Sequence, residues 1–116
     1  MITGLLMLAA ALGLAFNNVQ PHLTTPAELA RFTKCKPEAI SYYERARFTE
    51  PLGAEWKPAT ACMKEENNDC KCFSRVAKDT LDVCKIPAFI VVVKDGTHAV
   101  VAFGHGRVMD NGEIKK

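Results

Sequence analysis

Residues 67–84 carry the sequence Asn67-Asn68-Asp69-Cys70-Lys71-Cys72-Phe73-Ser74-Arg75-Val76-Ala77-Lys78-Asp79-Thr80-Leu81-Asp82-Val83-Cys84. Small or apolar residues recur in it every three or four positions, which is the spacing of one buried helix face. The three polar side chains before Cys70 can accept hydrogen bonds from the free amides of a first turn, so the helix is expected to begin at or just before Cys70. The other expected elements are placed relative to this helix.

The position of Cys70 favours chemistry at its sulfur. Free amides and the dipole at a helix N-terminus stabilise a thiolate, and the thiolate is the nucleophilic form of cysteine. At about 100° per residue, Cys70 lies about 50° from the middle of the apolar face and Cys72 more than about 100° from it. Only Cys70 is therefore expected to face a packed neighbour. The alternative is that both residues are ordinary structural cysteines.

Length and charge limit the classes of protein to consider. The chain has 116 residues, 48% hydrophobic content and a formal net charge of +2. This length predicts one globular domain with one small core. The basic residues are scattered, so no nucleic-acid partner is expected.

The first sixteen residues form an uncharged apolar segment rich in Leu, Ala, Met and Ile. Such a segment fits the core of a signal peptide or a buried helix, and it is short for a membrane span. If it is a signal peptide, the protein is exported; otherwise a cytoplasmic location is expected. Contact with a membrane is expected only if residues 1–16 are retained as an anchor. Residues 17–116 form the single expected domain.

The chain has an odd number of cysteines, at positions 35, 62, 70, 72 and 84. At least one is therefore unpaired in a monomer, which allows one reactive thiol and up to two disulfides in an oxidising compartment. The sequence does not choose among the pairings. The spacing lacks the paired Cys-x-x-Cys knuckles of a structural zinc site, so no metal is expected.

Two helices are expected before the cysteine helix. Thr25-Pro26-Ala27-Glu28 has the form of a capping box, and the helix it opens is expected to run to about Lys34. Pro37 opens the second, from Glu38 to about Phe48. His22, in the polar stretch before them, is expected to be a surface side chain.

The stretch from Thr49 to Glu66 contains prolines and a glycine and is expected to be an irregular loop. It holds Trp56, the only tryptophan of the chain. A lone tryptophan usually packs into a core, and the alternative is a substrate-binding role.

Beyond Cys84 the pattern changes to strands. Ile86 to Val93 and Thr97 to Phe103 are apolar, β-branched runs joined by the turn signal Asp95-Gly96. Arg107 to Met109 offers a third short strand. An α+β fold is therefore expected, with the cysteine helix packed on an antiparallel sheet of about three strands.

A histidine and an aspartate are expected to meet on this sheet. His98 lies near the start of the second strand, and a tight turn after that strand brings Asp110 within one residue step of His98. A thiolate, an imidazole that carries its proton and a carboxylate that orients the imidazole are the parts of nucleophilic catalysis. Cys70, His98 and Asp110 are therefore the candidate catalytic residues.

Five short motifs resemble a known family in order and spacing: Trp56-Lys57-Pro58-Ala59-Thr60, Asp69-Cys70-Lys71-Cys72-Phe73-Ser74, Ile86-Pro87-Ala88, His98-Ala99-Val100 and Val108-Met109-Asp110-Asn111. They are similar to the successive motifs of the transglutaminase-like superfamily, in particular its small bacterial and phage cysteine peptidases. Asn68 and Lys85 stand where that family usually has glycine, and Lys71 and Cys72 follow the cysteine where it usually has an acidic residue.

The resemblance implies a papain-like α+β fold and a hydrolase of the thiol-protease type that needs no cofactor. It implies Cys70 as nucleophile, His98 as base and Asp110 as the orienting carboxylate. The implied substrate is an amide bond of a peptide or protein, with water favoured over an amine as the acceptor.

Two other functions remain open. A thiol–disulfide protein would use Cys70 and Cys72 as a reversible pair. A non-catalytic binding or structural domain would bridge Cys70 permanently to one of the other cysteines. The state of Cys70 separates the three hypotheses, because the hydrolase needs it free.

Overall fold

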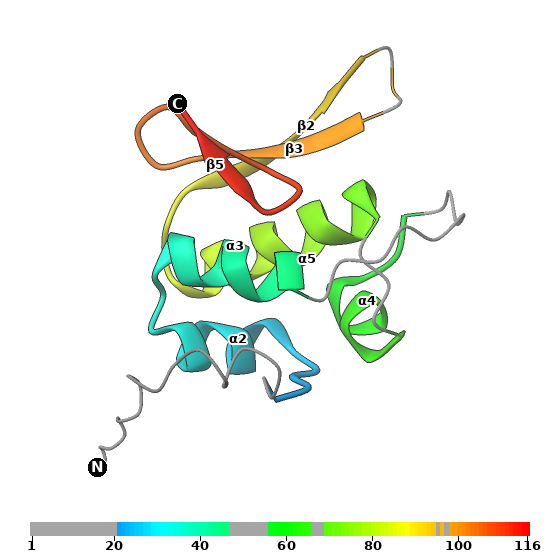
Figure 1. Cartoon of the computed structure of the whole chain (residues 1–116), viewed down its shortest axis with the longest axis vertical. Helices are drawn as coiled ribbons and strands as arrows, with labels where there is room; N and C mark the ends of the chain where they lie inside the picture. Colours follow the sequence, from blue (N-terminus) through cyan, green and yellow to red (C-terminus); the bar gives the residue numbers. More distant parts are fainter. Residues whose placement is uncertain (1–20, 47–55, 66–68, 95, 97) are drawn as a thin grey trace.

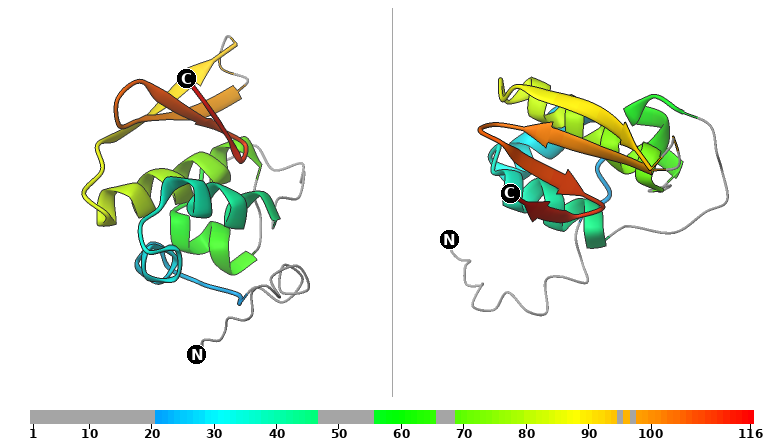
Figure 2. Two further views of the ribbon diagram at one scale, coloured as in Figure 1. Left: turned by 60° about the vertical axis from the view of Figure 1, so that its left-hand side comes forward. Right: turned by 90° about the horizontal axis from the view of Figure 1, so that it is seen from above.

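The computed structural model describes residues 21–46, 56–65, 69–94, 96 and 98–116. Within these residues the architecture is α+β: four helices precede a four-stranded sheet, and the helices lie on one face of that sheet (Figure 1). The view from above shows the strands spread over the helices, and none of the described helices lies on the other face of the sheet (Figure 2).

The N-terminal helices begin close to the expected residues. Helix α2 spans Pro26–Thr33, and its Thr25 hydroxyl accepts from the Glu28 amide at 3.1 Å. The reciprocal bond comes from the Thr24 amide, which donates to Glu28 Oε1 at 2.8 Å. Helix α3 spans Pro37–Ala46; its expected end near Phe48 lies outside the described residues.

A third helix occupies part of the stretch for which a loop was expected. Helix α4 spans Ala59–Glu65, so the expectation of an irregular chain is wrong here. Pro58 precedes the helix rather than interrupting it, and the Pro58 carbonyl accepts from the Ala61 and Cys62 amides at 3.0 and 3.1 Å. Proline at the start of a helix is tolerated because no amide is lost there.

Helix α5 spans Cys70–Val83 and is the centre of the fold. Asp69 caps it: its carboxylate accepts from the Cys72 amide at 2.9 Å. Asn67 and Asn68, the other cap candidates, lie outside the described residues. The predicted apolar face is buried, with Phe73, Val76 and Leu81 each 0% exposed.

The sheet is antiparallel with the order β2-β3-β4-β5. Its strands are β2 (Ala88–Val93), β3 (His98–Phe103), β4 (Arg107–Asp110) and β5 (Glu113–Lys115). The expected hairpin is present, although Asp95 and Thr97 lie outside the described residues. The fourth strand was missed, because Glu113–Lys115 has only three residues and a single apolar side chain.

The core lies between α5 and the sheet. Ala99, Val101 and Phe103, on one face of β3, are at most 3% exposed, and Val101 pairs with the fully buried Met109 of β4. Val101, Phe103 and Met109 form one cluster with the apolar face of α5 and with Leu29 and Ile40 from α2 and α3. The described residues thus contain one hydrophobic core cluster.

Two disulfides connect the helices. Cys35, after α2, is bonded to Cys84 at the end of α5, and Cys62 of α4 is bonded to Cys72. The expectation that Cys72 faces no packed neighbour is wrong: the residue is 1% exposed because α4 covers that side of α5. Cys70 is the free cysteine.

The apolar segment of residues 1–16 lies outside the described residues. Within the described part of the chain, no helix is long and apolar enough to cross a bilayer.

Candidate active site

The start of α5 and the start of β3 share a small cavity. Its volume is about 40 Å³, and the residues that line it are Trp56, Cys70, Lys71, Val92, Gly96, His98 and Ala99. Two of the three residues predicted for catalysis, and the tryptophan considered for substrate binding, therefore surround one space. Asp110 does not line the cavity itself, but it is hydrogen-bonded to His98, which does.

The backbone of α5 fixes the position of Cys70. Cys70 is the first residue of the helix, and the Asp69 cap engages the Cys72 amide. The side chain is partly buried and carries a free thiol. The positive end of the helix dipole, which favours negative charge, thus lies at the sulfur.

His98 and Asp110 are brought together by the register of β3 and β4. Met109 pairs with Val101, so Asp110 lies beside Val100 and on the same face as His98. His98 Nε2 and Asp110 Oδ1 are 2.7 Å apart, and the two side chains are 17% and 24% exposed. The predicted contact between the histidine and the carboxylate is therefore present.

The contact assigns different roles to the two ring nitrogens. With Nε2 bonded to Asp110, Nδ1 is the nitrogen left to exchange a proton with another group. Neither nitrogen is hydrogen-bonded to the Cys70 sulfur among the described contacts, so the two groups line the cavity without pairing. Hydrogen bonds of catalytic groups often tighten only once a substrate is bound.

A residue that the sequence did not single out supports Asp110. Lys115 on β5 donates from Nζ to Asp110 Oδ2 at 3.4 Å. Partial burial alone would raise the pKa of Asp110. The hydrogen bond and charge of His98, together with the charge of Lys115, outweigh this effect, so that the pKa of Asp110 lies below its usual value. Prediction of β5 as a strand would have been needed to find Lys115.

Trp56 lies at the rim of the cavity. Its side chain is 43% exposed, so packing into the core, which the sequence favoured, is wrong. The Arg75 guanidinium carbon lies 5.9 Å from the centre of the ring, a contact that holds the indole against α5. Trp56 is thus available to a molecule in the cavity. Lys71 also lines the cavity.

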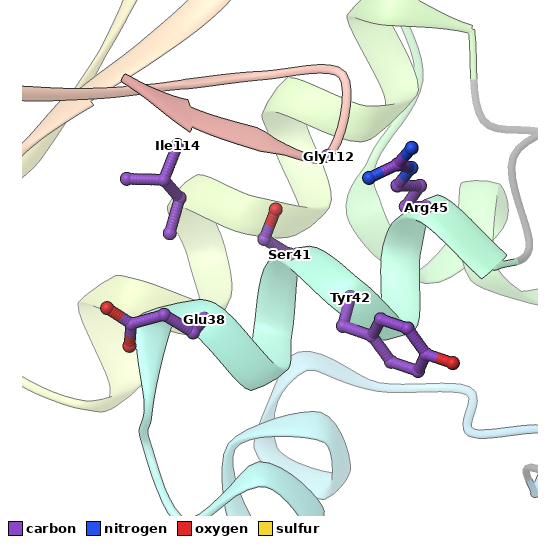
Figure 3. Close-up of a pocket in the computed structure, with 6 residues that line it drawn as sticks. All are labelled: Glu38, Ser41, Tyr42, Arg45, Gly112 and Ile114. Carbon is purple, nitrogen blue, oxygen red and sulfur yellow. The ribbon is translucent and has the colours of Figure 1, made fainter. Parts of the chain in front are cut away.

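A larger cavity of about 220 Å³ lies between α3 and β5 (Figure 3). The residues that line it are Glu38, Ser41, Tyr42, Arg45, Gly112 and Ile114. None of the predicted catalytic residues is among them. This cavity is linked to the candidate site only through the turn after β4. Gly112 follows Asp110 by two residues and packs against Arg45, and this contact holds the turn against α3.

No metal position is evident in the described part of the chain. There, no three His, Cys, Asp or Glu side chains converge closely enough to hold an ion. The groups at the cavity suit nucleophilic and acid–base chemistry, because a thiol, an imidazole and a carboxylate supply a nucleophile, a proton carrier and its support.

Comparisons with known proteins add no assignment. No protein-family model, curated protein or solved structure matches the chain.

Proposed function

We propose that the protein is a cysteine-dependent amide hydrolase or acyltransferase, of the transglutaminase-like type and with a papain-like arrangement of helix and sheet. The observation that carries the proposal is one cavity lined by the free thiol of Cys70 and by His98, whose far nitrogen is bonded to Asp110 at 2.7 Å. The order Cys, His, Asp along the chain supports the same conclusion.

The reaction would begin at Cys70. His98 Nδ1 takes the thiol proton, and the thiolate sulfur attacks the carbonyl carbon of an amide. The Cys70 backbone amide, at the free N-terminal end of α5, is the available donor to the negative oxygen that forms. His98 then returns the proton to the departing amine as the C–N bond breaks, which leaves a thioester on Cys70.

The thioester would then be released by water. His98 takes a proton from the water, the hydroxide oxygen attacks the thioester carbon, and the C–S bond breaks with the proton returning to sulfur. Asp110 keeps Nε2 engaged throughout, so that the ring holds one orientation and its cationic form is stabilised. We favour water over an amine acceptor because the motifs resemble those of the peptidase branch. No cofactor takes part in this scheme.

The two alternatives make different demands on the cysteines. A redox protein built on Cys70 and Cys72 needs these two to pair, whereas Cys72 is bonded to Cys62 here. A purely structural domain does not require a free thiol in the same cavity as a histidine that is bonded to an aspartate. Two disulfides are compatible with either an enzyme or a stapled binding domain, so a chemical test is required.

Acylation by p-nitrophenyl acetate tests the proposal without knowledge of the natural substrate. We expect an acetyl thioester on Cys70, located by peptide mass, and slow release of acetate by water. Cys70→Ala should abolish the adduct, and His98→Ala should slow its formation at least about 100-fold, the low end of a general base's contribution. His22→Ala is the matched control, because His22 bonds the Met63 carbonyl at 2.8 Å away from the cavity. Acetylation of Cys70 at the same rate in the wild type and in His98→Ala would overturn the proposal.

A further inference from the structure

The cavity at Cys70 is too small to hold a whole substrate. Pockets that enclose a ligand have volumes of roughly 300–1,000 Å³, whereas this one has about 40 Å³. It can receive a reacting group and little more. Most of any substrate must therefore bind the surface that adjoins the cavity.

Strand β2 adjoins it and is an edge strand. Among the described residues it pairs with β3 alone, because it is the first strand in the order β2-β3-β4-β5. Edge strands of soluble proteins are usually protected by charges, proline or bulges. The sequence of β2, Ala-Phe-Ile-Val-Val-Val, contains none of the protective residues.

The side chains of β2 are also unusually exposed for their type. Phe89 is 67% exposed, Val92 53% and Val91 40%. Exposed apolar side chains along a free edge offer both backbone hydrogen bonds and apolar contacts, the two elements by which a strand binds an extended peptide.

Strand β2 connects the cavity with a second hollow. Val92 lines the cavity that holds Cys70, and Phe89 lines a groove of about 190 Å³ formed with the turn after β3. These residues are three apart, which corresponds to about 10 Å of strand. They face opposite sides of the sheet, since Val92 pairs with the buried Ala99 and Phe89 with Ala102.

We propose that the free edge of β2 binds an extended, uncharged peptide segment of the substrate as an additional strand. The segment brings a backbone amide to Cys70 and places an apolar side chain, three residues from that amide, in the groove at Phe89. This inference deepens the proposed function and depends on it, because it names the substrate class of the same thiol. The substrate class is an unfolded or flexible chain with apolar residues, rather than a folded surface or a charged peptide.

The test measures protection of Cys70 from iodoacetamide by a peptide. The probe is an acetylated, amidated heptapeptide, Leu-Ser-Thr-Gly-Thr-Ser-Leu, whose two leucines lie three residues on either side of the central glycine, so that either strand direction satisfies the spacing. One control peptide has glutamate in place of both leucines. A second has alternate backbone amides methylated, which removes strand pairing and keeps the side chains. At about 1 mM, suited to weak binding, the probe should slow labelling at least twofold and neither control should do so.

Two variants locate the effect on β2. Val91→Lys places a charge on the exposed edge and should abolish protection while the labelling rate without peptide stays that of the wild type. Phe89→Asp should also abolish protection. Labelling of Cys70 that depends on His98 but is unaffected by all three peptides would overturn the inference and leave the proposed function standing. Labelling that does not depend on His98 would overturn the proposed function and the inference together. Light scattering gives a further test. If the wild type is a dimer and Val91→Lys is a monomer, a second copy of the chain occupies the edge of β2, and the inference about a peptide is overturned.

Discussion

Removal of each disulfide should destabilise the fold by an amount that its loop length predicts. The bond between Cys35 and Cys84 spans 49 residues, and the bond between Cys62 and Cys72 spans 10 residues. The chain-entropy model, in which a cross-link restricts the unfolded chain, gives about 4 kcal/mol for the longer loop and about 2.7 kcal/mol for the shorter one. Cys62 and Cys72 are almost fully buried, so their loss also leaves a small cavity, which adds to the second value.

The assay is urea unfolding followed by far-ultraviolet circular dichroism. The variants are the double substitutions Cys35→Ala with Cys84→Ala and Cys62→Ala with Cys72→Ala, and Cys70→Ala is the matched control. The first double variant should lose about 4 kcal/mol of unfolding free energy, the second about 3 kcal/mol, and the control less than about 1 kcal/mol, as a partly exposed thiol contributes little. A loss for Cys70→Ala equal to that of either pair would mean that Cys70 is itself bridged. That result would refute the pairing and the nucleophile together.

Three further substitutions test the support of the candidate site, and a fourth, Gly104→Ala, is a control. Gly112→Ala should cost about 2–4 kcal/mol of unfolding free energy, because its φ is +91° and its new Cβ would lie 2.6 Å from Arg45 Cβ. Gly104→Ala, at φ +60° with open space around it, should cost only about 1–2 kcal/mol, and equal losses would remove the contact with Arg45 from the explanation. Asp110→Asn should flatten the acid side of the stability profile: the lowered pKa of Asp110 stabilises the fold above the unfolded-state pKa, and this contribution is lost as pH falls through the folded-state value. An unchanged slope in urea titrations below about pH 5 would contradict the stabilising role of that carboxylate. Lys115→Met should raise the pKa of Asp110, observed by carboxyl carbon NMR, because one of the charges that lower it is removed; no rise would show that His98 alone holds the carboxylate.

Local signals were sufficient to predict most elements of the fold. The cap before Cys70, the capping box at Thr25 and the apolar spacing of α5 each depend on neighbours in the sequence, and each corresponds to an observed element. The hairpin of β2 and β3 follows from two β-branched runs around a turn signal. Helix α4 was missed because Pro58 and the glycine and proline before it indicate an irregular chain. The disulfide that joins α4 to α5 is a tertiary contact that these local signals do not contain.

The candidate site could be predicted where strand pairing controls it. His98 and Asp110 meet because a short turn sets the register of β3 and β4, and turn length is visible in the sequence. Lys115 could not be predicted, since it reaches Asp110 through a three-residue strand with little pattern. The exposure of Trp56 depends on Arg75 and on the shape of the cavity, which no local spacing encodes.

The proposed function requires that Cys70 be a nucleophile activated by His98. The most direct measurement is the rate of iodoacetamide labelling of the folded, unreduced protein as a function of pH, with peptide mapping to locate the modified cysteine. We predict that Cys70 is labelled at pH 6, where an ordinary cysteine thiol is largely protonated, and that His98→Ala slows this labelling at least about tenfold while His22→Ala does not. Cys70 recovered in a disulfide-linked peptide, or labelled at the same rate with and without His98, would contradict the account.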